Sequence, residues 1–457
     1  MSEAVREGTA EQADRRGIFG WMMFDWATQP FHTLIITFVF APYFTSHIAA
    51  TPVIGQEIWG YATGLAGLAI ALMAPVFGAI ADHTGPRKPW IAFFSIFGVV
   101  GCWILWFAAP GTDSITIAIA GVVLGLIGME MAAVFNNAMM PNLVPRAQLG
   151  RLSGSAWALG YIGGIVSLII VLGFMAAQPG TGKTLIGVTP IFGLDPASFE
   201  GDRASGPLTS IWYVLLVLPM FLFTPDARRT LVSHGEAVRQ GLRELRNTVV
   251  RLPKERSFFS YLVSSMLYRD ALNALYTFGG IYAAGVLGWS ITQIGVFGVL
   301  AALTGVFGAW LGGKADDRFG PIPVVSVSIV VLILCCLTIV STSSSEVFFI
   351  GVGSADAPSG LPTIMFYIAG CLIGAAGASL QAASRTLLVD QVTPERVTEA
   401  FGLYALSGKA TTFVGPLLIA VFTGLFESQR VGVTPVIVLF VAGIVLLPLV
   451  RSAHSKV

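Results

Sequence analysis

Seven acidic, basic or histidine side chains of this 457-residue chain lie more than three residues from either end of a long apolar segment, where ionisable groups are costly. They are Asp25, His32, Glu130, Arg269, Asp270, Arg385 and Lys409. A charge left unpaired at the centre of a bilayer costs at least ~2.5 kcal/mol, so such groups are candidates for ligand binding, proton transfer or pairing between helices. The six strongly ionisable groups comprise three acids and three bases, so they would be neutral overall if all were charged.

The first apolar segment places three of its polar residues on one helical face. Asp25, Gln29 and His32 stand at i, i+4 and i+7. Pro30 lies among them and removes a backbone hydrogen bond, which favours a kink at this place. We expect Asp25 to serve a function. His32 has two open interpretations, a neutral imidazole bonded between helices or a group that meets a solute or a proton.

Two further segments carry polar faces of the same kind. Glu130 and Asn137 stand at i and i+7, and Gln381, Ser384 and Arg385 stand at i, i+3 and i+4. Glu130 lies near the middle of its segment, where burial would favour the protonated carboxyl. Arg385 lies near the end of its segment, which favours a role at an inner gate. Its guanidinium could equally bind a carboxylate group of the solute.

Adjacent charges mark the first segment of the second half. Arg269 and Asp270 point about 100° apart on a helix, so each needs a partner on another helix. Asn273 lies one turn further on, and Lys409 reaches a comparable depth from a later segment. An Asp270–Lys409 bridge is the structural interpretation, and binding of an anionic group by Arg269 or Lys409 is the functional one.

The composition indicates what kind of structure contains these residues. Hydrophobic residues make up 55% of the chain and charged residues 11%, with a mean hydropathy of +0.78. A soluble domain carries about 25% charged residues, so most of this surface must face lipid. This balance excludes a cytosolic enzyme and a nucleic-acid binder. The four cysteines lie in apolar stretches without metal-ligand or disulfide spacing, and we expect neither a metal site nor a cofactor.

Twelve apolar segments approach or exceed the ~20 residues that cross a bilayer as an α-helix. They cover residues 18–48, 57–81, 90–109, 115–141, 152–177, 209–224, 257–286, 292–315, 322–342, 361–389, 399–426 and 431–450. The predicted fold is therefore an all-α integral membrane protein of twelve transmembrane helices in two six-helix halves. Its parts are a leader (1–17), an N-terminal bundle (18–224), a linker with an amphipathic helix (225–256), a C-terminal bundle (257–450) and a tail (451–457).

Basic residues set the expected orientation, because Lys and Arg collect on the cytoplasmic side. They occur in the leader and in the loops after the even-numbered segments, whereas the remaining loops hold only Lys183, Arg203 and Arg430. We therefore expect both termini to be cytoplasmic in a cell (inner) membrane protein.

A repeated loop motif supports the division into halves. The pattern G-x-x-x-D-x-x-G-P occurs after the second segment and again after the eighth. Its members are Gly78, Asp82 and Gly85, followed by the basic pair Arg87 and Lys88, and then Gly313, Asp317 and Gly320. The glycines permit tight turns. Each aspartate lies at the C-terminal, negative end of its own helix, where its charge is unfavourable. We therefore expect it to contact the N-terminus of another helix and to act as a conformational latch when the inner gate is closed.

The run GAIADHTGPRK at 78–88 resembles the loop motif of the major facilitator superfamily, and its second copy lacks the basic pair. Further motifs are similar to the autophagy-related vacuole effluxer branch and its bacterial relatives. They are FDWA at 24–27, TFVFAPYF at 37–44, SGSAWALGYIGG at 153–164, YRDA at 268–271, QAASR at 381–385 and FGLYALSGK at 401–409. The fungal members are implicated in amino-acid efflux from the vacuole, so the resemblance implies a small zwitterionic substrate.

These observations predict a monomeric secondary transporter that moves a small polar or zwitterionic solute by alternating access, with a proton as the expected coupling ion. A drug, sugar or lipid exporter of the same fold is the alternative. An intramembrane enzyme is a remote alternative, because no Ser/His/Asp set or metal motif occurs at the required depths. The sequence also lacks a phosphate-binding loop, which argues against direct ATP coupling.

Overall fold

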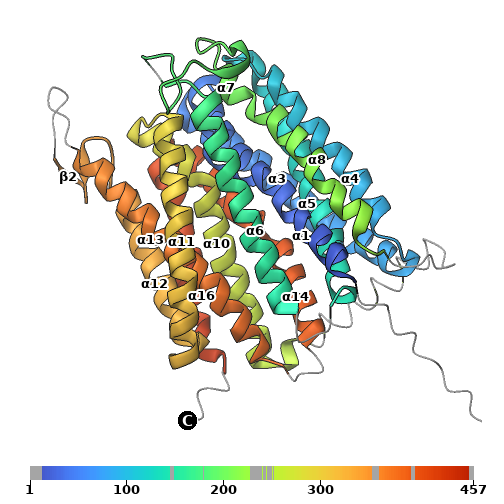
Figure 1. Cartoon of the computed structure of the whole chain (residues 1–457). Helices are drawn as coiled ribbons and strands as arrows, with labels where there is room; N and C mark the ends of the chain where they lie inside the picture. Colours follow the sequence, from blue (N-terminus) through green and yellow to red (C-terminus); the bar gives the residue numbers. More distant parts are fainter. Residues whose placement is uncertain are drawn as a thin grey trace, which may run out of the picture.

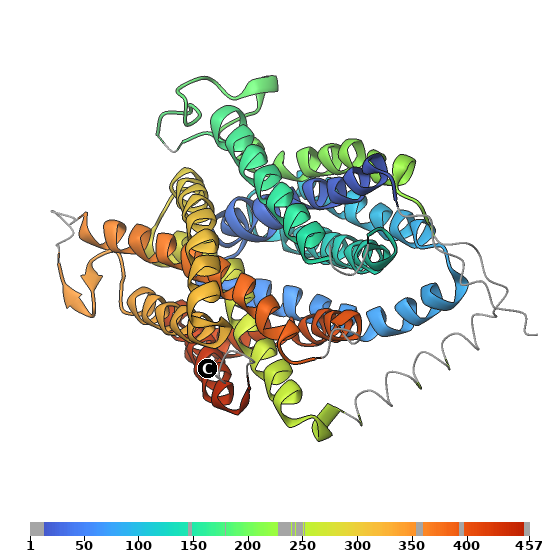
Figure 2. The same ribbon diagram turned by 60° about the horizontal axis from the view of Figure 1, so that its bottom comes forward.

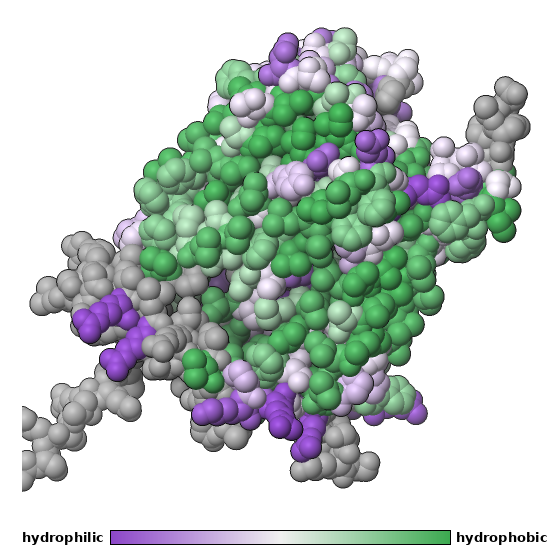
Figure 3. All heavy atoms as spheres, turned by 180° about the vertical axis from the view of Figure 1, so that it is seen from behind, coloured by the Kyte–Doolittle hydropathy of each residue, from purple (hydrophilic) through white to green (hydrophobic). Residues whose placement is uncertain are grey.

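The computed structural model describes residues 13–144, 149–178, 180–226, 239, 243, 250, 252–352, 360–392 and 397–451. Long helices stand side by side and form one elongated bundle (Figure 1). Figure 3 shows hydrophobic side chains over the flank of this bundle, with hydrophilic ones gathered mainly toward its ends. A surface of this kind matches a lipid bilayer in contact with the flank and water at both ends.

The first half crosses the bundle six times. Its helices are α1 (Arg15–Pro30), α2 (Phe40–Tyr43), α3 (Pro52–Thr84), α4 (Lys88–Ile104), α5 (Ile115–Met139), α6 (Leu149–Ile170), α7 (Glu200–Arg203) and α8 (Ser205–Phe223). The sixth crossing begins earlier than the expected residue 209, because the one-turn α7 leads directly into α8. Most of the linker predicted at 225–256, including its amphipathic helix, lies outside the described residues.

The second half is built in the same way. Its helices are α10 (Arg256–Leu287), α11 (Ile291–Phe319), α12 (Pro321–Val340), α13 (Leu361–Val389), α14 (Val397–Thr411), α15 (Val414–Phe426) and α16 (Gln429–Leu446). A two-stranded hairpin, β1 (Glu346–Val347) and β2 (Ile350–Gly351), connects α12 to α13. Figures 1 and 2 show the two halves beside each other, blue to green and yellow to red.

The all-α membrane fold is confirmed. Ten helical segments of the described chain are long and apolar enough to cross a membrane. α10 is also long enough, with 32 residues, but it carries charged and polar residues such as Arg269 and Asp270 within its length. The predicted segment 399–426 is divided into α14 and the short apolar helix α15. With these two crossings, the described part of the chain is consistent with the expected twelve.

The first crossing is less regular than the single helix expected at 18–48. Pro30 ends α1, and the chain continues as a π-helix over Phe31–Phe38. Val39 then leaves helical geometry, with φ −121° and ψ −69°, before α2 and a second π-helix, Phe44–Ile48. Proline lacks the backbone N–H that donates a hydrogen bond inside an α-helix, so Pro30 interrupts the helix. π-Helical segments within helices are frequent at functional sites. The break therefore lies beside the polar face of Asp25, Gln29 and His32.

The halves contact each other at the end of the bundle that holds Ile48, Pro52 and Gly288, here called the opposite end. The end that holds Arg15 and Val450 is called the terminal end. At the opposite end, α3 packs against α15. The Gln56 amide donates hydrogen bonds to Thr423 Oγ1 at 2.8 Å and to the Gln429 carbonyl at 3.3 Å.

Glycines allow this close approach of α3 and α15. A Cβ atom at Gly60 would lie 2.8 Å from the Pro416 carbonyl oxygen, and one at Gly64 would lie 2.6 Å from Leu417. Neither distance is compatible with a larger residue in this arrangement. The opposite end is therefore closed by direct backbone packing together with buried hydrogen bonds.

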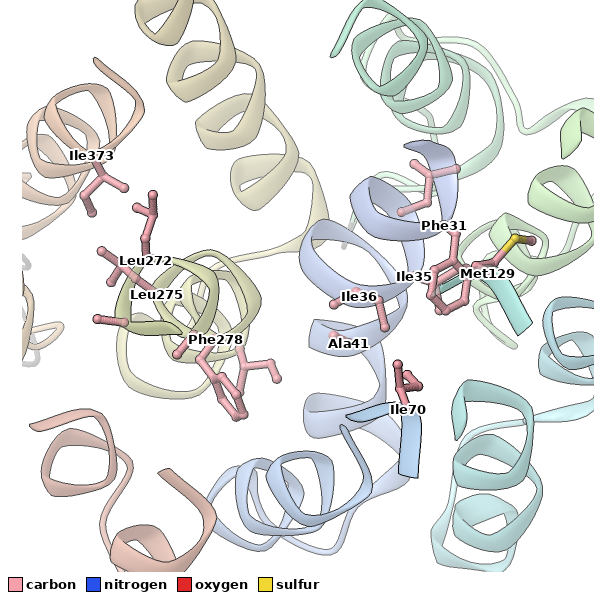
Figure 4. Packing of buried hydrophobic residues seen from close by; sticks show 14 of the residues in the cluster. Phe31, Ile35, Ile36, Ala41, Ile70, Met129, Leu272, Leu275, Phe278 and Ile373 are labelled. Carbon is pink, nitrogen blue, oxygen red and sulfur yellow. The ribbon is translucent and has the colours of Figure 1, made fainter. Parts of the chain in front are cut away.

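Buried apolar side chains also pack between the helices within each half, as part of one cluster that runs through the bundle. Figure 4 shows Phe31 and Ile35 of the first crossing beside Met129 of α5, and Leu272 of α10 beside Ile373 of α13. All five side chains are buried. Such contacts hold the helices of each half together.

Candidate functional site

The Asp25 face of the first crossing lies against α6. A Cβ atom at Gly160 would lie 3.5 Å from Asp25 Cβ, and one at Gly164 would lie 3.0 Å from Gln29 Cγ. The Gln29 amide donates a hydrogen bond to Thr33 Oγ1 at 3.5 Å. Small residues on α6 therefore allow the polar face of α1 to lie close to that helix.

His32 and Glu130 meet between the first crossing and α5. His32 Nε2 lies 3.9 Å from Glu130 Oε1, with side chains 37% and 18% exposed. The sequence placed both residues at functional depth without pairing them. Asn137, which was expected on the Glu130 face, is exposed near the end of α5. A histidine next to a carboxylate is suited to the transfer of a proton.

Arg269 lies against α14 rather than against its neighbour Asp270. Its guanidinium stacks on the Tyr404 ring, with Cζ 3.9 Å from the ring centroid, and Nη1 donates to the Tyr404 carbonyl at 3.0 Å. A Cβ atom at Gly408 would collide with this guanidinium, so the glycine provides its space. The stacking fixes the cation while leaving part of its hydrogen-bonding capacity for another group.

Tyrosines surround this cation. Tyr261 stacks on Tyr404 with ring centroids 6.2 Å apart, and its hydroxyl donates to the Ser384 carbonyl at 2.5 Å. The Tyr268 hydroxyl lies 2.8 Å from Ser384 Oγ. Ser384, predicted on the polar face of α13, is thus used to join α10 to α13. The tyrosines at i and i+7 on α10 were missed, although their spacing on one face was visible in the sequence.

Asp270 is buried, with 3% of its surface exposed. Thr411 on α14 lies within hydrogen-bonding reach of its carboxyl group, and Arg269 interacts with it electrostatically. Its Oδ1 has no hydrogen-bond partner among the described atoms. The Lys409 side chain lies outside the described residues, so the Asp270–Lys409 bridge stays a prediction. Asn273 is exposed one turn further along α10.

The polar faces of the two halves meet around α13. Arg385 lies 5.7 Å from the Trp157 ring of α6 and interacts electrostatically with Asp25. Gln381 comes within hydrogen-bonding reach of Tyr161 on α6 and of Tyr276 on α10. The segments 24–27, 153–164 and 381–385 are therefore brought together. We call Asp25, Tyr161, Arg269, Gln381 and Arg385 the central cluster.

The central cluster combines two guanidinium groups with one carboxyl group. Arg269 and Arg385 are close enough to repel each other electrostatically, and Asp25 lies near Arg385. Such a set can bind a carboxylate through the arginines and can release or accept a cation or proton at Asp25. Among the described residues, no three His, Cys, Asp or Glu side chains are arranged to hold a metal ion.

The first loop motif has the turn geometry that its glycine requires. Gly85 has φ +97° after α3, and a carboxyl group from the end of the first half meets the residues that follow. Asp226 accepts hydrogen bonds from the backbone N–H groups of Arg87 and Lys88, at 2.9 Å each. Lys88 Nζ donates to the Phe221 carbonyl at 2.8 Å. The basic pair therefore joins the start of α4 to the end of α8 within one half.

The latch interpretation of the loops stays a prediction, because the Asp82 side chain lies outside the described residues. A Cβ atom at Gly78 would meet nothing within 4 Å. In the second copy, Gly320 has φ +79°, Asp317 is exposed, and its neighbour Asp316 is buried at 8% exposure. Asp316 was missed because the repeat pattern aligned Asp317 with Asp82.

Solved structures of known transporters share this architecture. A D-xylose–proton symporter matches 96% of this chain and 98% of its own, with a TM-score of 0.67 and 12% identity. A POT family transporter in complex with 5-aminolevulinic acid matches 95% and 94%, with a TM-score of 0.62 and 15% identity. At these identities the likeness shows the fold. Together with the arrangement in two six-helix halves, it defines the fold as that of the major facilitator type.

The sequence comparisons narrow this class. Residues 56–457 match the model of the vacuole effluxer Atg22-like family, and the chain belongs to that family. An uncharacterized MFS-type transporter, YxiO, of Bacillus subtilis is 25% identical over 439 residues, which cover 95% of each chain. Autophagy-related protein 22 of Cryptococcus neoformans is 21% identical over 319 residues, 67% of this chain and 51% of the fungal protein. The resemblance drawn from the motifs is confirmed.

Proposed function

We propose that this transporter moves a small zwitterionic solute, such as an amino acid, by alternating access and couples the movement to a proton. The carrying observation is that Asp25 on α1 and Arg385 on α13, one from each half, lie near enough to attract each other electrostatically. A zwitterion presents a carboxylate and an ammonium group, which suit Arg269 or Arg385 and Asp25 respectively. Binding of the solute would then replace the attraction between Asp25 and Arg385 by contacts of each side chain with the solute.

The proposed proton carriers are Asp25 and the His32–Glu130 pair. Glu130 Oε1 lies 3.9 Å from His32 Nε2, so a proton held by this pair changes the charge of one wall of the site. When the carrier changes state without a solute, a proton on the carboxylate removes an unpaired charge, which is costly inside the membrane. Asp270 is the corresponding candidate in the second half, where Lys409 is instead a candidate partner of the solute's anionic group.

We infer that the protein acts as a monomer in the cell inner membrane with both termini in the cytoplasm. The basic residues of the leader and of the loops at the terminal end support this orientation. The closed α3–α15 contact then faces the outside. In this orientation the described arrangement corresponds to a carrier whose exit toward the outside is shut.

Uptake into liposomes tests the proposal. Purified protein would be reconstituted and supplied with labelled amino acids, sugars and cationic dyes, with imposed pH or sodium gradients. We expect an unchanged amino acid to accumulate along a proton gradient, and protein-free liposomes provide the control. Selective movement of sugars or dyes would support the exporter alternative, which the exposed Trp157 beside Arg385 favours. Chemical conversion of the solute would reveal an enzyme.

A further inference from the structure

The hairpin between α12 and α13 exposes three large apolar side chains in succession. Phe348, Phe349 and Ile350 are 53%, 67% and 68% exposed, whereas the preceding Val347 is 6% exposed. We call Phe348, Phe349 and Ile350 the hairpin tip. Figure 1 shows β2 projecting from the side of the bundle, next to the start of α13. The tip therefore points away from the helices and not into either half.

The backbone of the tip is one that phenylalanine adopts rarely. Glu346 pairs with Gly351 and Val347 pairs with Ile350, so Phe348 and Phe349 form a two-residue turn. Their φ angles are +53° and +61°. Such turns strongly favour Asn-Gly, because a Cβ atom is strained at positive φ. Two phenylalanines in these positions indicate that their side chains supply an interaction that compensates the strain.

Polar contacts fix the base of the hairpin to the bundle. Arg430 at the start of α16 forms an ion pair with Glu346 at 3.0 Å and donates to the Val340 carbonyl at 3.0 Å. The Phe349 N–H donates to the Ser341 carbonyl at 3.0 Å. The Arg430 guanidinium also lies 5.1 Å from the centroid of the Phe349 ring. These contacts hold the tip outward, with a charged pair at its base.

The tip continues the lipid-facing surface of the neighbouring helices. On α12, Leu334 and Leu337 are 57% and 49% exposed, and on α13, Leu361 and Ile364 are 42% and 55% exposed. Phe, Trp and Leu side chains on the apolar face of an interfacial segment are buried about 5–10 Å deep at the headgroup–acyl boundary, while charged groups stay on its polar side. We propose that the hairpin tip inserts into the headgroup–acyl boundary of the lipid bilayer at the opposite end of the bundle.

Spin labelling of the full-length protein in phospholipid nanodiscs tests this insertion. Cys371 would be replaced by serine, since Cys102, Cys335 and Cys336 are buried. A nitroxide would then be attached to Phe349→Cys. We expect its collision rate with oxygen, relative to that with a water-soluble nickel complex, to be several-fold higher than at Ala197→Cys, an exposed loop position. Leu334→Cys on α12 provides the lipid-facing reference.

A second variant separates insertion from folding of the hairpin. Phe348→Asn with Phe349→Gly supplies the sequence that this turn favours, so the hairpin should form while its aromatic anchor is lost. A label at Ile350→Cys should then become several-fold more accessible to the nickel complex than in the parent tip. Nickel accessibility at Phe349→Cys equal to that at Ala197→Cys would overturn the proposal. Dipolar coupling between the tips of two copies would also overturn it, in favour of a protein contact.

Discussion

At the scale of single residues, the charges inside this transporter differ in what they touch. Arg269 is stacked and hydrogen-bonded to Tyr404 within one half, whereas Arg385 faces Asp25 and Trp157 of the other half. A charge that is satisfied within its own half keeps its partner when the halves move. A charge that interacts across the interface would lose its partner in such a movement, so under the proposed alternating access we expect Asp25 and Arg385 to respond to the state of the carrier.

Asp25→Asn should abolish accumulation driven by a proton gradient while exchange of solute across the membrane remains measurable. The amide keeps the size of the side chain but cannot carry a proton or a charge. Uptake and exchange in liposomes separate these effects, with exposed Asp113→Asn as the matched control. Glu130→Gln is the parallel test of the His32 pair. Loss of exchange together with accumulation would indicate a role in binding or structure instead.

Arg269→Lys should weaken solute binding, although the charge is retained. Lysine cannot stack on Tyr404 and donate to its carbonyl in the same way. A cation–π contact contributes about 0.5–2 kcal/mol, which corresponds to about a two- to thirtyfold increase in the dissociation constant. Binding to the detergent-solubilised protein measures the change. Lys314→Arg, which alters a lysine over Trp310 on the exposed side of α11, should leave the affinity unchanged.

The sequence predicted these site residues by type and depth, but few of their partners. Asp25 and Gln29 both lie against α6, as their spacing of one helical turn predicts. His32 follows Pro30 in the π-helix and faces Glu130 on α5, so the single face predicted for all three residues stays a prediction. The His32–Glu130 contact and the position of Arg385 opposite Asp25 depend on how separate helices pack, which spacing within a helix does not encode. The tyrosines were overlooked because they are apolar enough to pass as core.

At the scale of elements, breaks in helices could be predicted only where one residue type enforces them. Pro30 indicated the irregular first crossing, and Gly85 and Gly320 indicated turns with positive φ. The break between α14 and α15 had no such indication in the sequence analysis. Asp226 was also missed, since its partners are backbone N–H groups far away in the sequence.

Gln56→Ala should shift the carrier toward a form that is open at the opposite end. The substitution removes two buried hydrogen bonds between α3 and the second half, each contributing about 0.5–1.5 kcal/mol. Distances between spin labels at Ile54→Cys and Glu427→Cys measure the opening in nanodiscs. Gln293→Ala, at the start of α11, is the control because its capping contact lies within one helix. An unchanged distance distribution would show that the glycine packing alone closes this end.

At the scale of the whole molecule, the structure describes one set of contacts between the halves, and this set closes the opposite end. The repeat of the loop motif in the two halves predicts a second set at the terminal end. Alternating access needs the two sets to have similar strength, because a large imbalance would hold the carrier in one state. Modest changes at either end should therefore shift the population.

Asp82→Asn should increase the population that is open at the terminal end. Loss of one contact between a charge and a helix N-terminus, worth about 0.3–2 kcal/mol, shifts a nearly balanced equilibrium severalfold. In the second half, Asp317→Asn should have a smaller effect, because its loop lacks the basic pair and the side chain is exposed. Cysteine accessibility at both ends measures the shift. Because Asp316 is the buried carboxylate beside that loop, Asp316→Asn should shift the population more than Asp317→Asn does. If the ratio of the two open forms is unchanged in Asp82→Asn, the latch is refuted.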